Sequence, residues 1–417
     1  APALEATRFD LHDSLKEGGK NVGGGGHRMR SLFVITQVAL ALVLLVGAGL
    51  LLRSFRRLQS VDPGFNSQNL LTVRVSLPPG KYAEETKRID FFKQAIDRMK
   101  AIPGVEAAGA INTPPFTGLY SGTTVEVDGQ DLPPDQELKT GVCVTDANYF
   151  RVMQIPLKQG RFYTEQEATE MRHVVLVNEA FVRKNLGGGN PLGRKLTIYM
   201  KDENVPSEII GVVGDHKHLG LDTAVEPVAY WPHPELVYPG MTLVLRTKGD
   251  EGAVAPAARA VIRGLDPQQP IGEISTMESL LATSVARSRF SASLLTVFSF
   301  LALIMAAVGI YGVMSYSVLQ RTHEIGVRMA LGAQRLDVLK LVVKKGVVLA
   351  LIGVAAGLAA SFALTRLIAS LLFEVTTTDT LTFAAVSIGL FLVTLLACYL
   401  PARRATRVDP LKALRYE

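Results

Sequence analysis

Four long stretches without a single Asp, Glu, Lys or Arg dominate this sequence. They comprise residues 31–52, 290–320, 346–365 and 380–402. A helix needs about 20 residues to cross roughly 30 Å of hydrocarbon, so each stretch is long enough to span a membrane. Buried core helices are the alternative, but they seldom exceed about 14 residues without a charged face. The sequence therefore predicts an integral membrane α-helical protein with four transmembrane helices.

The charged residues predict how these helices are oriented. Three segments, 1–30, 321–345 and 403–417, hold 16 of the 44 lysine and arginine residues but only 8 of the 38 acidic residues. Basic residues collect on the cytoplasmic side of a membrane. We therefore expect both termini and the 321–345 loop to be cytoplasmic, and residues 53–289 to form a large domain on the other side, with a short external loop at 366–379.

Three arginines directly after the first stretch, Arg53, Arg56 and Arg57, argue mildly against this orientation. The formal net charge of +6 makes nucleic acid a candidate partner. Because the positive charge sits beside the spans, anionic lipid of the inner leaflet is the simpler partner, and we expect no nucleic-acid binding. Cys143 lies in the external region and Cys398 in the last span, so we expect no disulfide between them.

The first residues of the chain repeat the last ones. Residues 2–15 match residues 401–414 at seven positions, all at one constant offset. We interpret residues 1–15 as the tail of an upstream copy in a tandem duplication, followed by a flexible glycine-rich join at 23–26. A coincidence between two basic segments next to a membrane is the alternative.

The external region has the pattern of an α+β domain. Residues 71–75 alternate apolar and polar side chains as a half-buried strand does, and residues 84–101 carry apolar residues on one helical face. A second strand is expected at 105–111, and the same strand–helix–strand order returns at 242–246, 253–263 and 270–274. Two such units can pair into one split ferredoxin-like sheet.

Residues 140–238, between the two units, have short strands of their own at 174–177 and 209–213 and a helix at 179–185. We interpret this stretch as an inserted subdomain.

The return to the membrane predicts a long helix. Ser275 and Glu278 have the spacing of a capping box, and residues 276–319 contain no proline. If continuous, these 44 residues would extend about 66 Å, twice the hydrocarbon thickness. A partner stripe follows the first span at Phe55, Leu58 and Val61 and ends at Asp62-Pro63-Gly64. Two rigid rods could transmit motion; slightly long, tilted spans are the alternative.

The cytoplasmic loop contains the most specific motif. Residues 321–333 read Arg-Thr-His-Glu-Ile-Gly-Val-Arg-Met-Ala-Leu-Gly-Ala, which predicts a short amphipathic helix with small residues where another protein could approach. Here the chain resembles the MacB/FtsX family of ABC-transporter permeases, whose loop between spans two and three carries a motif of the type E-I-G-x-x-[RK]-A-[LI]-G-A. The sequence departs from it at Met329, which separates Arg328 from Ala330. The tail at 401–415 fits the family pattern, and the likeness covers nearly the whole chain.

The resemblance implies a coupling helix seated on a separate ATPase subunit. Its residues would be Glu324, Ile325, Gly326, Arg328, Ala330, Gly332 and Ala333. The family implies that the permease works as a dimer, or with the upstream half of a duplicated chain, and that ATP binding moves stalk helices and reshapes the outer domain. Residues 61–65 and the tail resemble duplicated orphan permeases, of which this chain would be the second half.

The family also implies a subdivision of the external region. It resembles the MacB arrangement, with a porter-like part at 66–139 and 239–274, a sabre-like subdomain inserted at 140–238, and a stalk helix at 275–289.

Motifs for catalysis or cofactor binding are incomplete. Residues 188–196 lack the Gly-Lys-[Ser/Thr] ending of a phosphate-binding loop, and His323-Glu324 lacks the second histidine of a zinc protease. Asp215, His216 and His218 could bind a metal, but a solvated turn is the simpler interpretation. We therefore expect no catalytic residue, no cofactor and no metal site.

These observations favour the permease subunit of a mechanically coupled ABC system in a bacterial inner membrane, which exports or extracts a substrate. A periplasmic adaptor is a further candidate partner. A signal transmitter that regulates an external partner, such as a cell-wall hydrolase, fits the same features. A membrane-anchored enzyme with its site in residues 140–238 is a third hypothesis. The spans carry almost no ionisable side chain, which fits transport that bypasses the membrane interior.

Overall fold

The computed structural model describes residues 24–130, 137–198, 205–320, 322–331 and 334–406. The chain divides into two compact units. We call residues 1–57 with 288–417 the membrane unit, and residues 58–287 the outer domain. Each is described by itself.

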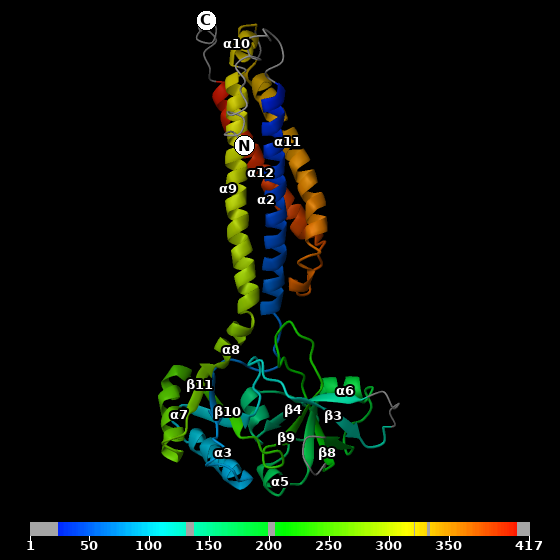
Figure 1. Cartoon of the computed structure of the whole chain (residues 1–417), viewed down its shortest axis with the longest axis vertical. Coiled ribbons are helices and arrows are strands. Elements are labelled where there is room, and N and C mark those ends of the chain that lie inside the picture. The colour runs from blue at the N-terminus through cyan, green and yellow to red at the C-terminus, as the bar shows by residue number, and fades with distance from the viewer. Residues whose placement is uncertain (1–23, 131–136, 199–204, 321, 332–333, 407–417) are drawn as a thin grey trace, which may run out of the picture. The chain divides into compact units, whose positions relative to one another are not determined.

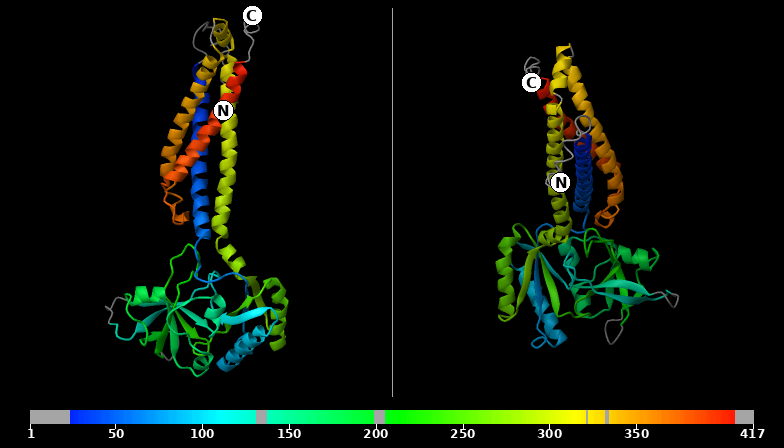
Figure 2. Two further views of the ribbon diagram at one scale, coloured as in Figure 1. Left: turned by 180° about the vertical axis from the view of Figure 1, so that it is seen from behind. Right: turned by 45° about the horizontal axis from the view of Figure 1, so that its top comes forward.

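The membrane unit contains four helices that are long and apolar enough to cross a bilayer, as the sequence predicts. They are α2 (Gly24–Gln59), α9 (Ala286–Gln320), α11 (Arg335–Leu364) and α12 (Thr380–Ala405), and two short helices accompany them, α10 (Thr322–Ala330) and the 3-10 helix η1 (Ala369–Leu371). α2 runs alongside α9 and α11 (Figures 1 and 2). Half of its most apolar window is buried, against 17 to 33% for the other three, so α2 forms the centre of the bundle.

Close approach between α2 and α11 depends on two glycines one turn apart. A Cβ atom on Gly353 would lie 2.8 Å from the side chain of Val38, and one on Gly357 would lie 2.8 Å from that of Leu42. Small residues at this spacing let two membrane helices pack backbone to backbone, where van der Waals contact is the main attraction. On α9, the hydroxyl of Ser299 donates to the carbonyl of Leu44 at 2.7 Å.

The outer ends of the helices are held by polar contacts. Arg53 on α2 forms an ion pair with Asp379, the residue that caps α12 by accepting from the main-chain N–H of Thr382 at 3.0 Å. The hydroxyl of Ser54 accepts a hydrogen bond from the main-chain N–H of Phe373 at 2.8 Å. α2 is therefore tied to α12 and to the loop that precedes it.

The outer domain is built on one eleven-stranded sheet, in which ten strands follow the order β11-β1-β10-β2-β4-β3-β7-β8-β6-β9 and β5 pairs with β8. Its strands are β1 (Leu70–Ser76), β2 (Val105–Ile111), β3 (Gly122–Val127), β4 (Leu138–Thr145), β5 (Leu157–Gly160), β6 (Val174–Asn178), β7 (Lys195–Ile198), β8 (Ser207–Val213), β9 (Val228–Pro232), β10 (Gly240–Thr247) and β11 (Ile271–Thr276). Its helices are α3 (Glu85–Lys100), α4 (Tyr149–Met153), α5 (Glu165–Thr169), α6 (Glu179–Asn185), α7 (Glu251–Leu265) and α8 (Met277–Ser284).

The first half of the sheet is ferredoxin-like, as predicted. β11, β1, β10 and β2 pair antiparallel in that order, so the two strand–helix–strand units interlock. Helices α3 and α7 pack against each other and against these strands (Figure 1). Phe92 and Met99 of α3 and Ile262 of α7 are buried in the shared core.

The second half contains the remaining strands and joins the first through a short seam. Only Ile111 and Thr145 pair directly between β2 and β4. Two main-chain hydrogen bonds flank this pair, from Asn112 N–H to the carbonyl of Val144 at 3.0 Å and from Asp146 N–H to the carbonyl of Ala110 at 3.1 Å. Side chains add two more: Asn112 Oδ1 accepts from the N–H of Val144 at 2.8 Å, and Asp146 Oδ1 accepts from the N–H of Ala110 at 2.7 Å. β3 pairs with β4 and β7. By strand pairing, β3 therefore belongs with the inserted half, although the sequence pattern predicts the division between the two parts at residue 140.

The predicted long helix of 276–319 is wrong, because it is interrupted at Val285. α8 ends at Ser284 and α9 begins at Ala286. The hydroxyls of Thr283 and Ser284 donate to main-chain carbonyls of the preceding turn, a competition that bends or ends helices. The capping box is wrong as well: Thr276 is the N-cap of α8, accepting from the N–H of Ser279 at 3.1 Å, whereas Ser275 bonds Glu273.

Candidate functional site

A short helix, α10, lies between α9 and α11, at the position where the sequence predicts a coupling helix. Glu324, Ile325, Gly326, Arg328 and Ala330 lie in it, while Gly332 and Ala333 lie outside the described residues. Glu324 and Arg328 form an ion pair at 2.7 Å across one turn, with about half of each side chain exposed. Both charges are therefore accessible to another protein.

Apolar side chains are exposed around α10. Leu319 precedes it with 72% of its surface exposed, and Leu331 and Leu336 follow it with 83% and 61%. Protein interfaces combine such an apolar centre with charged groups at the rim. This end of the membrane unit has both, within a stretch of 18 residues.

The same end of α9 is fixed to its neighbours by two arginine–tyrosine contacts. The guanidinium of Arg30, on α2, lies 4.1 Å from the ring centre of Tyr316. Arg404, on α12, donates to the hydroxyl of Tyr311 at 2.6 Å. A displacement of α9 at this end would therefore also move α2 and α12.

At the other end of α2, the chain enters the outer domain through a segment at 62–68 that is closely bound. The carbonyl of Pro63 accepts from the N–H of Lys217 at 2.8 Å, and the N–H of Asn66 donates to the carbonyl of Met153 at 3.1 Å. Gly64 has a φ of +83°, and a Cβ there would overlap the carbonyl of Asp215. Glycine is required at this position both by its backbone conformation and by the lack of space.

Arg246 of β10 clamps this segment to both halves of the outer domain. Its side chain is buried and donates to three carbonyls: Nε to Val152 at 2.7 Å, and the two terminal nitrogens to Gln68 at 3.0 Å and Asn66 at 2.9 Å. Val152 belongs to α4, in the inserted half. Burial lowers the pKa of Arg246, and the three carbonyl dipoles offset the cost of placing the charge inside.

The predicted metal candidates do not form a metal site. Asp215 caps α6 by accepting from the N–H of Ala180 at 2.8 Å, and it pairs with Arg183 at 2.5 Å. No group of three His, Cys, Asp or Glu side chains within the described part of the chain has the spacing of a metal site. The acid is therefore engaged in holding α6.

The solvated turn favoured from the sequence is wrong, because His216 and His218 are buried, with 4% and 8% of their surfaces exposed. The ring of Phe65 stands edge-on to His216 at 6.3 Å, and that of Tyr120 lies 6.2 Å from His218. Burial lowers the pKa of His216 to about 3, with a further contribution from His218, and burial lowers the pKa of His218 to about 4. Both histidines are neutral at physiological pH.

A cavity of about 80 Å³ follows the seam between the two halves. Its floor is apolar, with Phe92 and Ile96 of α3 on one side and Ala168 of α5 on the other. An ion pair between Lys93 and Glu165, at 3.9 Å, crosses it at the rim. The two walls belong to different halves of the sheet, so a change in their relative position would open or close this cavity.

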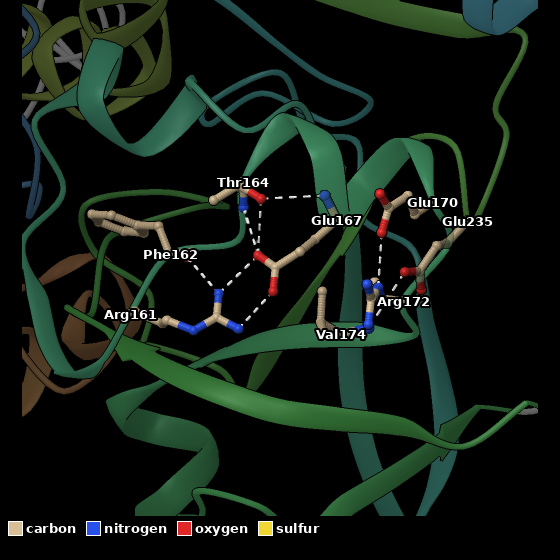
Figure 3. A network of polar contacts seen from close by, with 8 residues as sticks. All are labelled: Arg161, Phe162, Thr164, Glu167, Glu170, Arg172, Val174 and Glu235. Atoms are coloured by element: carbon tan, nitrogen blue, oxygen red, sulfur yellow. Dashed lines mark hydrogen bonds and ion pairs between the residues drawn. The ribbon is translucent and has the colours of Figure 1, made fainter.

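The wall formed by α5 is stiffened by the network shown in Figure 3. Arg161 donates two hydrogen bonds to the carboxylate of Glu167, at 2.8 and 2.6 Å, while Thr164 and Glu167 form a reciprocal capping box. The hydrogen bonds from Arg161 are the main reason that the pKa of Glu167 falls to about 2. Further along, Glu235 accepts from the N–H of Val174 at 3.3 Å.

Known protein families match two parts of the chain. The family described as "MacB-like periplasmic core domain" matches residues 31–264, and the family described as "FtsX-like permease C-terminal" matches residues 296–410. The second range includes α10.

Among curated proteins, similar sequences are export ATP-binding/permease proteins. The probable syringafactin export protein SyfD of Pseudomonas syringae pv. tomato is 28% identical over 64% of this chain and 41% of its own length. The macrolide export protein MacB 2 of Aeromonas hydrophila is 26% identical over 99% of this chain and 61% of its own length. The chain thus spans about half the length of these relatives. Among solved structures, the periplasmic region of MacB from Actinobacillus actinomycetemcomitans matches with a TM-score of 0.37 and 15% identity, over 54% of this chain and 97% of that one.

Proposed function

Because this chain belongs to the MacB/FtsX family of ABC-transporter permeases, we propose that it converts the closure of an ATPase in the cytoplasm into movement of its outer domain. It is a multi-pass inner-membrane protein, and its sequence matches the permease part of relatives that are ATP-binding/permease proteins. ATP hydrolysis would then occur on a separate subunit. The movement would drive export or extraction of a substrate at the outer face.

The observation that carries the proposal is the continuity of α9. This helix runs without interruption for 35 residues, about 52 Å, from the residue next to the break at Val285 to the residue just before the α10 loop. A helix of this length displaces as a unit, so a push at α10 would arrive at Val285. The break there would let α9 change its angle to α8 as it moves, so α8 would not have to follow as a rigid continuation of the same helix.

A second route would pass through α2, which adjoins α9 in the membrane unit. Its displacement would pull on residues 62–68 and therefore on the Arg246 clamp, which holds both halves of the outer domain. Because the direct strand pairing at the seam is a single residue pair, this is the place where the sheet would yield. We propose that the two halves move relative to each other when the ATPase closes.

The residues proposed to receive the force are Glu324, Ile325, Gly326, Arg328, Ala330, Gly332 and Ala333. The proposal requires them on the cytoplasmic side together with both termini. It also implies a second permease copy, or the upstream half of a duplicated chain, because one ATPase pair closes on two permease loops. A periplasmic adaptor is a further expected partner.

The test first identifies the ATPase that co-purifies with the full chain and then expresses the two proteins together. Glu324→Lys and Gly326→Leu should each abolish stimulation of that ATPase while leaving insertion and folding intact. Glu126→Lys is the control, since it makes the same charge change at an exposed position of β3. Full stimulation in both α10 variants would remove the coupling role.

The partners captured with the chain test the rest of the proposal. An adaptor or an outer-membrane channel supports export, whereas capture of a cell-wall hydrolase would replace export by signal transmission. Catalytic turnover by a fragment of residues 58–287 would replace both the export and the signalling hypotheses by a membrane-anchored enzyme. Labelling of an introduced cysteine at Glu324 from the same side as the outer domain would contradict the proposed orientation.

A further inference from the structure

Arginines gather at the ends of α2 and α9 that connect to the outer domain and just after α11, whose end lies at the same level of the bundle. They are Arg53, Arg56, Arg57, Arg289 and Arg366, which we call the arginine belt. Membrane proteins keep most of their basic residues on the cytoplasmic side. In the proposed orientation the belt lies on the opposite side, so the positive-inside rule does not explain these arginines.

Contacts between the helices place the belt at one level. Leu44 of α2 contacts Ser299 of α9, and Gly47 of α2 lies against Leu295 of α9. Arg53 lies six residues after Gly47, and Arg289 lies six residues before Leu295, both toward the end that connects to the outer domain. At 1.5 Å per residue, both advance about 9 Å. The two helices therefore present their arginines at the same depth.

α11 and α12 place charged residues at the same level. Gly357 of α11 meets Leu42 of α2, and Arg366 follows nine residues later, level with the turn of α2 that precedes Arg53. Asp379 at the start of α12 binds Arg53 directly. Arg56 and Arg57 lie about one turn further out.

The belt borders the apolar surface of the bundle. Leu52, Phe290, Leu364 and Leu381 are exposed next to it, with 39, 67, 45 and 68% of their surfaces accessible. Arg56, Arg289 and Arg366 are exposed just beyond. Charged side chains directly above a lipid-facing apolar surface lie at the depth of the phospholipid headgroups.

The chemistry of the belt favours phosphate. Every basic residue in it is arginine, whose planar guanidinium binds two phosphate oxygens at once, as lysine does not. Asp379, one of the two acids at this level, is occupied by Arg53, and Glu374 is the other. We propose that the arginine belt binds the phosphates of anionic phospholipids in the leaflet next to the outer domain. The bound lipids would hold the outer ends of α2, α9 and α11 at a fixed depth.

The test measures lipid binding by the full chain purified in detergent. The chain is incubated with phosphatidylglycerol or phosphatidylcholine, and retained lipid is counted by mass spectrometry. The variant carries Arg56→Gln, Arg289→Gln and Arg366→Gln. Each arginine near an anionic surface strengthens binding about five-fold, so the triple variant should lose most of its preference for phosphatidylglycerol. The control carries Arg98→Gln, Arg151→Gln and Arg263→Gln, which remove the same charge from exposed positions of the outer domain.

Two further measurements complete the test. A triple lysine variant at the belt positions keeps the charge and should retain part of the preference, and it replaces the glutamine variant if that variant fails to fold. Inorganic phosphate should not displace the lipid. Displacement by phosphate would assign the belt to a free anion, and an equal preference in the belt variant and the control would overturn the proposal.

Discussion

The guanidinium of Arg246 donates to the main-chain carbonyl of Asn66 at 2.9 Å, across 180 residues of sequence. Asn66 belongs to the segment that leaves α2, and Arg246 belongs to the ferredoxin-like half of the sheet. The same guanidinium bonds the carbonyl of Val152 in the inserted half. One side chain therefore joins the entry from the membrane to both halves of the outer domain.

Replacing Arg246 by Met should destabilise the outer domain by about 1–3 kcal/mol, because the buried carbonyl of Val152 loses its donor. The carbonyls of Gln68 and Asn66 are only part-buried, so water can replace the donor there. Urea unfolding of the full chain in detergent can be followed through Trp231, the single tryptophan, which is buried in β9.

Arg74→Met is the matched control for this prediction, because Arg74 is an exposed arginine in the adjacent strand β1. It should leave the unfolding midpoint within about 0.5 kcal/mol of the original. Equal midpoints for the two variants would show that the three hydrogen bonds of Arg246 contribute nothing to stability.

The features that repeat locally could be predicted from the sequence. The absence of charge over 20 or more residues predicted the four spans, and alternation followed by helical spacing predicted both strand–helix–strand units. The helix at 179–185 begins and ends where it was expected, because Asn178 caps it through its side chain. The short helix α10 was likewise predicted from its own residues.

The features that depend on tertiary contact could not be predicted. Arg246 follows an alternating strand pattern and would be taken for an exposed residue, but α4 covers that face of β10. His216 and His218 look like part of a polar turn, and the aromatic rings that bury them come from distant segments. The break at Val285 arises where the hydroxyls of Thr283 and Ser284 bond main-chain carbonyls of the helix. The prediction of a continuous helix considered only the absence of proline and therefore missed this break.

Gly357→Leu should destabilise the membrane unit by about 1–3 kcal/mol, because the added side chain would collide with Leu42 and with the carbonyl of Ala39. Gly389→Leu on α12 is the control, since a Cβ there meets nothing within 4 Å. The temperature at which the detergent-solubilised protein aggregates should fall for the first variant and stay unchanged for the second. The same loss in both would show that the glycine is not needed for helix packing.

The outer domain should lose stability as the pH falls below 6.5. His216 and His218 take up protons with a pKa of about 3 and about 4 when folded, against 6.5 when unfolded. The unfolded chain therefore binds more protons in this window, so the free energy of unfolding is complete above pH 6.5 and decreases toward pH 4. Each histidine contributes roughly 1 kcal/mol per pH unit. Urea midpoints from Trp231 fluorescence at pH 7, 6 and 5 measure the decrease.

His218→Gln should make this pH dependence shallower, because glutamine keeps a donor for the carbonyl of Leu119 but takes up no proton. The slope is compared with that of the unchanged chain, measured at the same three pH values. A slope that is identical in the His218 variant and the original would show that the buried pair does not set the acid sensitivity.

Exchanging the two charges of α10, with Glu324→Arg and Arg328→Glu together, separates the proposed docking role of Glu324 from its role in the helix. The ion pair across one helical turn contributes only about 0.3–0.5 kcal/mol and forms again after the exchange. If Glu324 mattered through this pair alone, the double variant would recover ATPase stimulation that Glu324→Arg loses. We expect no recovery, because both side chains are exposed and a docked ATPase would meet each charge at the wrong position. Unchanged helicity, measured by circular dichroism, confirms that α10 still folds, and recovery would assign Glu324 to helix stability instead of docking.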